Sequence, residues 1–206
     1  MVQEIRDRGR RMTRKTIVRG KGTTRQAILT AARKRFATAS YDDVGLRDLA
    51  ADVGVDVAYV HRCFGSKKQL FRKVLDAGKG DFEIAAIDET KLASELARAL
   101  FDREWASACD EPDPLLVMVQ SLASPTAGRM VGERLAEDAI EPLRRKIGDA
   151  SPLRAALILS LLIGFDILDK LVELPEVTEA DPERAEALVA RAIDALLDLG
   201  EPADRL

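Results

Sequence analysis

Hydrophobic residues recur at helical spacing between Thr23 and about Ala39, with polar residues between them. A repeat of three and four residues places its members on one face of a helix. Thr23 and Gln26 match a capping box, in which both side chains bond free amides at the start of a helix. We therefore expect a first helix over this range. Its apolar face consists of Ile28, Leu29, Ala32 and Phe36.

A polar break at residues 40–43 precedes a second, shorter apolar pattern. The pattern fills one face of a short helix. Gly54 follows it, and glycine readily adopts the left-handed backbone conformation that ends many helices. We therefore expect a second helix that ends at Gly54. Its apolar positions are Leu46, Leu49, Ala50 and Val53.

A third and a fourth helix are expected to start at residues with capping chemistry. Asp56 can accept a hydrogen bond from the free amides of a helix whose inward residues are Val60 and Phe64. Ser66 and Gln69 then form a second capping box at the start of the fourth helix. The apolar face of that helix consists of Leu70, Phe71, Val74 and Leu75.

The rest of the chain also has helical patterns, and no alternating pattern is long enough to predict a strand. Proline near the helix starts and glycine after the helix ends separate the segments. The fold class predicted from these patterns is all-α. The expected helices are Thr90–Cys109, Pro114–Leu122, Pro125–Ile147, Pro152–Leu174 and Pro182–Leu199.

The apolar content does not predict a membrane helix or a secreted protein. The longest nearly uncharged run, Ala155–Phe165, has 11 residues, against the roughly 20 that a membrane helix needs. The basic N-terminus is followed by no apolar segment of the kind found in secretory signals. Two cysteines, Cys63 and Cys109, do not make a disulfide framework. We expect a cytoplasmic protein that does not bind membranes.

Charge is distributed very unevenly along the chain. Residues 1–75 carry a net charge of +11 and residues 76–206 a net charge of −14. A basic first third favours a polyanionic partner, whereas the acidic remainder argues against a nonspecific coating of nucleic acid. The alternative is an ordinary solvated surface. Residues 1–21 contain eight basic residues and no apolar stripe, and we interpret them as a mobile arm that either contacts DNA or remains solvated.

The second and third expected helices, joined by a turn at Gly54, form a helix-turn-helix, whose second helix enters the DNA major groove. Arg62 can donate two hydrogen bonds to guanine O6 and N7. Val57 and Ala58 can contact a thymine methyl group, and Tyr59 and His61 can donate to phosphates or bases. Lys67 is expected in the first turn of the fourth helix, where free amides favour a phosphate.

Each of these residues also has a structural alternative. His61 could be a core residue, or a metal ligand together with carboxylates and Cys63, although no second histidine is present. Tyr59 could pack against the first helix, and Arg62 could pair with an acidic neighbour. Lys67 could be a solvated lysine. We expect Cys63 to be a packed filler rather than a redox sensor, and we expect no metal.

The segments TTRQAILTAARKRF and GLRDLAADVGVDVAYVHRCFGSKKQLF, with the helical remainder, resemble the TetR family of transcriptional regulators. The resemblance is sharp over about residues 23–75 and architectural beyond them. It implies a homodimer, built from a three-helix DNA-binding domain, a connecting fourth helix and a helical ligand-binding domain whose last two long helices form the dimer interface. By position it implies DNA contacts at Val57, Ala58, Tyr59, His61, Arg62 and Lys67.

The resemblance also sets the expected domains, which are a basic arm over residues 1–21, a DNA-binding domain over 22–66 and an effector-binding and dimerisation domain over 67–206. Two residues depart from the family pattern. His61 stands where a phosphate-contacting Tyr is commonest, and Gly45 stands where a Thr or Ser usually caps the second helix.

The last two long helices have faces suited to dimerisation. Small residues spaced four apart allow a partner helix to come close, and apolar residues on the last helix can cover them. The alternative is that both faces pack inside one subunit. The expected interface residues are Ala156, Ser160, Gly164, Val189, Ala192, Ile193 and Leu196.

Large apolar residues of the middle helices are the candidates for an effector pocket. Nearby carboxylates, Asp166 and Asp169, favour a cationic or hydroxylated effector, although Asp166 also fits a simple ion pair with Lys170. Ordinary core packing is the alternative for each apolar residue. The candidate pocket residues are Phe101, Trp105, Met118, Leu122, Met130, Phe165 and Asp169.

These residues favour one function class over two others. An enzyme is disfavoured because the chain has no G-x-S-x-G or H-E-x-x-H motif, a failed phosphate-loop spacing around Gly20, and a single histidine. We expect no catalytic residues and no cofactor. The prediction is a repressor that a small apolar effector releases from an inverted-repeat operator. A helix-turn-helix regulator without an effector remains the alternative.

Overall fold

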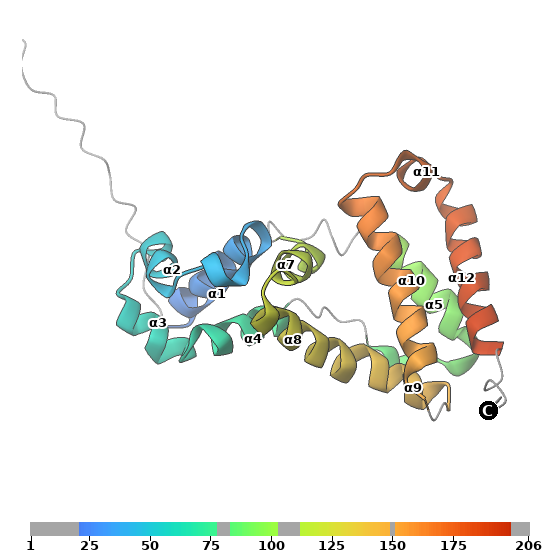
Figure 1. Ribbon diagram of the computed structural model, residues 1–206, viewed down its shortest axis with the longest axis horizontal. Coiled ribbons are helices and arrows are strands. Elements are labelled where there is room, and N and C mark those ends of the chain that lie inside the picture. Colours follow the sequence, from blue (N-terminus) through green and yellow to red (C-terminus); the bar gives the residue numbers. More distant parts are fainter. Residues whose placement is uncertain (1–20, 78–82, 103–111, 149–150, 199–206) are drawn as a thin grey trace, which may run out of the picture.

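The computed structural model describes residues 21–77, 83–102, 112–148 and 151–198. Over these residues the chain is helical and contains no strand (Figure 1). The predicted all-α fold is thus confirmed. None of the described helices combines the length and apolar character needed to cross a bilayer. The predicted basic arm up to residue 20 lies outside the described residues.

The N-terminal helices follow the predicted order. They are α1 (Lys21–Thr38), the short 3₁₀ helix η1 (Tyr41–Asp43), α2 (Leu46–Val53), α3 (Val57–Phe64) and α4 (Lys67–Ala77). The inward faces are also as predicted, since Leu49, Val60 and Leu70 are each fully buried.

Local capping chemistry accounts for three of these boundaries. Gly54 ends α2 with φ of 70° and ψ of 37°. Asp56 starts α3, its Oδ1 accepting from the amide of Ala58 at 2.6 Å. At the start of α4, the amide of Ser66 donates to Gln69 Oε1 at 2.8 Å, and the amide of Gln69 donates to Ser66 Oγ at 3.2 Å.

The expected capping box at Thr23 is wrong. Helix α1 already includes Lys21, so Thr23 lies inside the helix instead of at its N-cap. Gly22 does not end the helix because a single glycine inside a helical pattern is tolerated at a cost of about 1 kcal/mol.

The later helices agree with the predicted ranges except at their ends. The expected helix Thr90–Cys109 ends at Phe101, since Asp102 has a non-helical backbone, and Cys109 lies outside the described residues. The expected helix Pro152–Leu174 ends at Lys170, before a turn with Glu173 at φ of 51°. The elements are η2 (Ile84–Ala86), η3 (Glu89–Lys91), α5 (Leu92–Phe101), α7 (Pro114–Ser121), α8 (Pro125–Leu135), α9 (Glu141–Lys146), α10 (Leu153–Lys170), α11 (Pro175–Thr178) and α12 (Pro182–Asp198).

The expected helix from Pro125 to Ile147 contains a wider π turn at Ala136–Ile140, which joins α8 to α9 without a loop. Pro142, in the first turn of α9, explains it. Proline has no amide hydrogen to donate, and its ring clashes with the carbonyl one turn earlier; the wider turn relieves both problems. Glu141, at the start of α9, accepts hydrogen bonds from Arg144 and Arg145 of the same helix, which lower its pKa to about 2.

The buried side chains form two separate clusters. The first contains the inward residues of α1 to α4 together with Val117 of α7 and Ala127, Met130 and Val131 of α8. The second joins α5, α9, α10 and α12 around Leu96, Leu143 and Ile158. Figure 1 shows the same division, with α8 running from the N-terminal helices to the second group. Buried residues on both sides of the expected domain boundary at residue 66 thus belong to one cluster.

Candidate DNA-binding surface

Helix α3 is held to the first cluster by one face and exposes the other. Val60 is fully buried and Phe64 is 7% exposed. Ala58, His61 and Arg62 are exposed. Amphipathic spacing explains this division, because residues 60 and 64 are one helical turn apart. Of the predicted contact residues, these three thus point away from the core.

Two of the predicted contact residues are only partly accessible. Val57 and Tyr59 are half-buried and pack against the first cluster. A hydrogen bond with the thiol of Cys63 raises the pKa of Tyr59. The guanidinium carbon of Arg62 lies 5.1 Å from the centroid of the Tyr59 ring. The Tyr59 ring therefore helps to position the Arg62 guanidinium, and Cys63 has a partner in the Tyr59 hydroxyl.

His61 is attached to the end of its own helix. Its Nδ1 lies 2.8 Å from the carbonyl oxygen of Gly65. The amide of Gly65 donates to the carbonyl of His61 at 2.7 Å, so the two residues are connected twice. The imidazole is consequently a defined part of the α3–α4 turn.

Lys67 occupies the predicted first turn of α4 but is turned toward η1. Its Nζ donates to the carbonyl of Asp42 at 3.1 Å and lies 4.5 Å from the centroid of the Tyr41 ring. Burial lowers the pKa of Lys67, against the opposing influence of Asp42 and Asp43. The sequence analysis missed this contact because the two segments are 25 residues apart along the chain.

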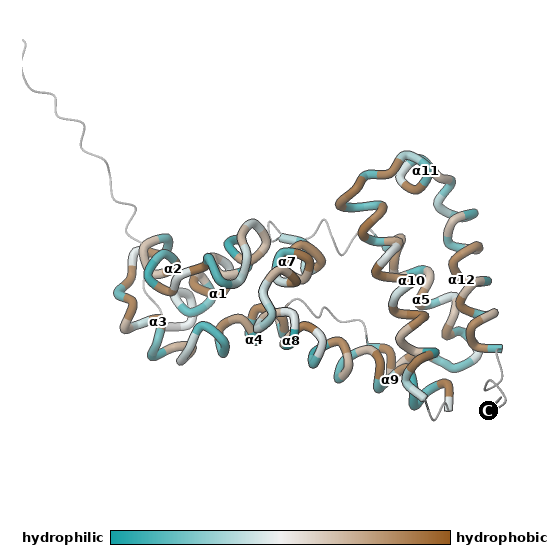
Figure 2. Tube along the Cα trace, viewed as in Figure 1, coloured by the Kyte–Doolittle hydropathy of each residue, from teal (hydrophilic) through white to brown (hydrophobic). Residues whose placement is uncertain are grey.

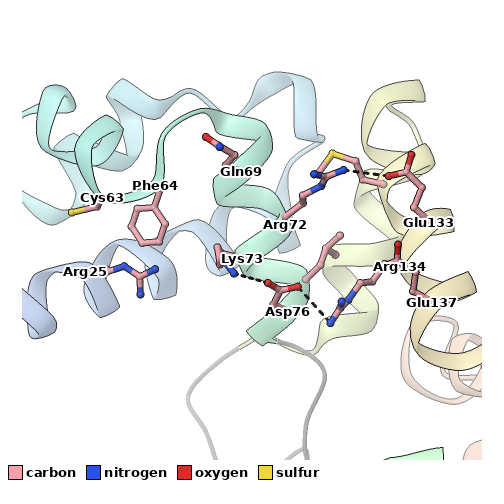
Figure 3. Close-up of a pocket in the computed structure, with 12 residues that line it drawn as sticks. Arg25, Cys63, Phe64, Gln69, Arg72, Lys73, Asp76, Glu133, Arg134 and Glu137 are labelled. Carbon is pink, nitrogen blue, oxygen red and sulfur yellow. Dashed lines mark hydrogen bonds and ion pairs between the residues drawn. The ribbon is translucent and has the colours of Figure 1, made fainter. Parts of the chain in front are cut away.

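A groove of about 470 Å³ lies beside α3, between α1, α4 and α8 (Figure 3). Arg25 lies over the ring of Phe64 at 4.9 Å. Two ion pairs connect α4 to α8: Arg72 with Glu133 at 3.4 Å, and Asp76 with Arg134 at 3.4 Å. These ion pairs at the surface connect α4 to α8 at two points, and each contributes about 0 to 1 kcal/mol.

The predicted pocket residues do not form one site: three of them lie together and the others that the structure describes lie elsewhere, which corrects the set. Phe101 and Asp169 line one cavity, and Phe165 packs on Phe101 with a centroid distance of 5.3 Å. Met118 lines a different cavity of about 200 Å³ beside α1, and Met130 is buried in the first cluster. Leu122 is 59% exposed, and Trp105 lies outside the described residues. Helical periodicity gives the face of each residue but not which helix packs against that face.

The cavity at Phe101 and Asp169 has a volume of about 470 Å³ and lies among α5, α10, α11 and the start of α12. Apolar residues such as Leu100, Val177 and Pro182 line part of it. Lys170, also at the cavity, forms the expected ion pair with Asp166 at 2.9 Å and lies 3.8 Å from Asp113. Burial raises the pKa of Asp166. The acidic lining residues are Asp102, Asp113, Asp169 and Glu173.

The predicted dimer residues divide into two groups. Val189 is 7% exposed and Ile193 is fully buried, because α12 packs against α5 of its own subunit. This corrects their assignment to the interface. Leu196 is half-buried against the same cluster. The other four are exposed or half-buried: Ala156, Ser160, Gly164 and Ala192.

Several large apolar residues near those four are exposed. Leu153, Leu157 and Leu168 of α10 are 64%, 46% and 40% exposed, and Leu188 of α12 is 55% exposed. Figure 2 shows hydrophobic residues along most of α10. Among the described residues, no group of three or more His, Cys, Asp or Glu side chains is arranged to hold a metal.

Comparison with known families identifies both parts of the chain. The family model for bacterial regulatory proteins of the tetR family matches residues 28–74, and the model for the tetracyclin repressor-like C-terminal domain matches residues 90–197. No curated protein sequence matches the chain.

Solved structures share the fold. A TetR-family regulator from Streptomyces coelicolor is 26% identical with a TM-score of 0.54, over 87% of this chain and 97% of the other. A Pseudomonas aeruginosa protein described as a transcriptional regulator is 16% identical with a TM-score of 0.62, over 87% and 93%. The multidrug binding protein EbrR, complexed with ethidium, is 21% identical with a TM-score of 0.53, over 82% and 97%. With both of its parts matched by models of one family, this chain belongs to the TetR family of transcriptional regulators.

Proposed function

We propose that this TetR-family protein is a repressor that binds an inverted-repeat operator as a homodimer and is released by a small-molecule effector. The observation that carries the DNA-binding part is the exposed face of α3, where Ala58, His61 and Arg62 are exposed while Val60 and Phe64 anchor the helix. A capped, well-anchored helix with a polar outer face suits the major groove.

Five of the predicted contact residues have proposed roles here. Arg62 reads a guanine through two hydrogen bonds, with Tyr59 fixing its position, and Ala58 and the exposed part of Val57 contact a thymine methyl group. Lys67 contacts a phosphate after leaving the carbonyl of Asp42.

Selection of bound duplexes from a random DNA pool tests this proposal. We expect an enriched inverted repeat whose half-sites are separated by about one DNA turn. Arg62→Ala is expected to weaken discrimination at one base position by about 1–3 kcal/mol and to leave the others unchanged. Leu122→Ala, an exposed change at the end of α7, is the matched control. Failure to enrich any sequence would refute specific DNA binding.

The dimer is proposed to form through the exposed faces of α10 and α12. Contiguous exposed apolar residues mark interaction sites on soluble proteins. Ala156, Ser160 and Gly164 provide a narrow strip on α10 along which a second copy can approach closely. Leu157 and Leu188 lie on the exposed faces of these two helices and would contact the partner. A twofold axis through this surface would duplicate α3 and so account for an inverted repeat.

The effector is proposed to occupy the cavity at Phe101 and Asp169. Its lining combines an aromatic ring with four carboxylates and a single lysine that is already paired. Such a lining favours an apolar ligand that carries a positive charge. Carboxylates close to one another repel, and a cationic ligand would neutralise part of their charge. EbrR, which has the same fold, is complexed with ethidium in its structure.

A thermal-shift measurement with proflavin and ethidium tests the effector site. We expect each dye to raise the melting temperature of the wild-type protein, since a ligand that binds only the folded state stabilises it. Asp169→Asn should reduce the shift, whereas Glu183→Gln, outside the lining, should not. Absence of any shift with these dyes and with a wider cationic panel would favour a regulator without an effector.

A further inference from the structure

His61 is the single histidine of the 206-residue chain, and one contact of its ring indicates which nitrogen carries the proton of the neutral form. Its Nδ1 lies 2.8 Å from the carbonyl oxygen of Gly65. A carbonyl oxygen can only accept, so Nδ1 must be the donor. The neutral ring therefore has a lone pair on Nε2.

The backbone holds this arrangement in place. Gly65 has φ of 76° and ψ of −110°, and its amide donates to the carbonyl of His61 at 2.7 Å. The ring and the turn are thus joined by a reciprocal pair of hydrogen bonds. Turning the ring over to present a protonated nitrogen to DNA would break one of them.

Whether Nε2 carries a proton decides which groups His61 can bind. In the neutral ring Nε2 only accepts, and a phosphate oxygen also only accepts, so the two cannot form a hydrogen bond. In the imidazolium form Nε2 donates and the ring is positively charged. Histidine is the side chain whose charge most readily changes between about pH 5 and pH 8.

We propose that His61 takes up a proton when the protein binds DNA, so that affinity for DNA falls as pH rises. This inference rests on the proposed function, in which α3 lies against the duplex. A tyrosine at this position would donate its hydroxyl hydrogen at any pH in this range. The departure from the family pattern therefore makes the contact depend on pH.

Most other ionisable groups near this turn already have partners within the protein. On α3, Arg62 lies over Tyr59, whose hydroxyl is hydrogen-bonded to Cys63. On α4, Lys67 donates to the carbonyl of Asp42, and on α1, Arg25 lies over Phe64. Lys68 of α4 is exposed. No carboxylate in the described part of the chain pairs with His61, which leaves a DNA phosphate as the anion that would hold the proton.

The test measures affinity for the selected duplex at constant salt between about pH 6 and pH 8. For the wild-type dimer we expect a fall of roughly 10- to 100-fold, with a slope of at most about two protons per dimer. His61→Tyr should show a flat profile and should bind more tightly than the wild type at the upper end. His61→Gln, whose amide donates without titrating, should also be flat.

A second measurement needs no variant. Calorimetric titration of the wild-type protein with the same duplex, in two buffers of different ionisation enthalpy at about pH 7, counts the protons taken up on binding. Uptake of at least one proton per dimer is expected. Equal pH profiles for the wild type and His61→Tyr, together with no proton uptake, would overturn the inference. Loss of all sequence-specific binding at every pH would instead refute the proposed function.

Discussion

At the scale of single residues, Gly65 has the most demanding backbone of the DNA-binding helices. Its φ of 76° and ψ of −110° are accessible mainly to glycine. A Cβ at this position would lie 1.9 Å from Gln69 Oε1, the atom that accepts from the amide of Ser66. Gly65 therefore connects the end of α3, the His61 ring and the cap of α4 in one turn.

Gly65→Ala is expected to destabilise the protein by about 1–3 kcal/mol, the usual range for a residue forced into such a conformation. Displacement of Gln69 adds to the loss. The midpoint of urea unfolding measures it. Gly54→Asn is the control, because asparagine tolerates the left-handed conformation and a Cβ there meets no atom within 4 Å. An equal effect of the two changes would contradict this account.

The ion pair between Arg35 and Asp52 predicts a small pH dependence of stability. Arg35 donates to both carboxylate oxygens, Nε to Oδ2 at 2.5 Å and Nη2 to Oδ1 at 2.8 Å, and so joins α1 to α2. The hydrogen bond from Arg35 lowers the pKa of Asp52. Since the pair is exposed and screened by water, we expect Asp52→Asn to cost about 0.5 to 1 kcal/mol at neutral pH.

The direction of this pH dependence follows from the lowered pKa of Asp52. The stabilisation is present above the pKa of an unfolded aspartate, about 3.9, and disappears as pH falls through the lower folded value. Urea unfolding of the wild type and Asp52→Asn should therefore differ at pH 7 and converge in acid. Arg35→Lys keeps the charge but loses the paired geometry, and should show part of the loss. A difference that persists in strong acid would exclude this origin.

At the scale of helices, α3 owes its start to a single side chain. Asp56 Oδ1 accepts from the amide of Ala58, and no other side-chain cap is present at this N-terminus. Without the Asp56 carboxylate, the Ala58 amide at the start of α3, which carries most of the candidate DNA contacts, would lose this hydrogen bond. Capping residues of this type contribute about 0.5–2 kcal/mol.

Asp56→Ala is expected to lower stability by about 1 kcal/mol and to weaken DNA binding in proportion to the fraying of α3. Asp56→Asn, which retains an accepting oxygen, should have a much smaller effect on both. Denaturant unfolding and titration of the selected duplex measure the two quantities. Identical losses in both variants would mean that the carboxylate acts through charge and not through capping.

Capping chemistry also explains how much of the fold the sequence could predict. The starts of α3 and α4 and the end of α2 depend on neighbours within four residues, so Asp56, Ser66 and Gly54 identified them. The π turn before Pro142 was not predicted because helical spacing indicated one continuous helix and did not show where that helix widens. Val189 and Ile193 were assigned to the wrong surface, since an apolar stripe does not reveal whether its own subunit covers it. The contact between Lys67 and η1 depends on packing that no local pattern encodes.

At the scale of the whole molecule, the exposed leucines of α10 and α12 predict the assembly. Leu157→Glu places a charge on the surface proposed to meet a second copy. Because Leu157 is 46% exposed in the subunit, the change should leave the subunit folded and should weaken dimerisation by several kcal/mol, the effect of an unpaired charge buried at an interface. Light scattering at micromolar concentration should then give a monomer.

The matched control for this prediction is Leu122→Glu. Leu122 is 59% exposed and lies at the end of α7, which packs mainly against α1 and α8. This variant should remain a dimer. A monomeric wild type, or dissociation of both variants alike, would contradict the proposed interface.

The first buried cluster has a practical consequence for engineering. Val117 and Met130, from beyond the fourth helix, complete the packing around Phe36 and Phe71. A fragment cut after Ala77 would expose the apolar side chains that α7 and α8 cover. Chimeric regulators that join only the helices up to Ala77 to the effector domain of another protein should therefore aggregate. Chimeras that also include residues 112–135 should remain folded and soluble.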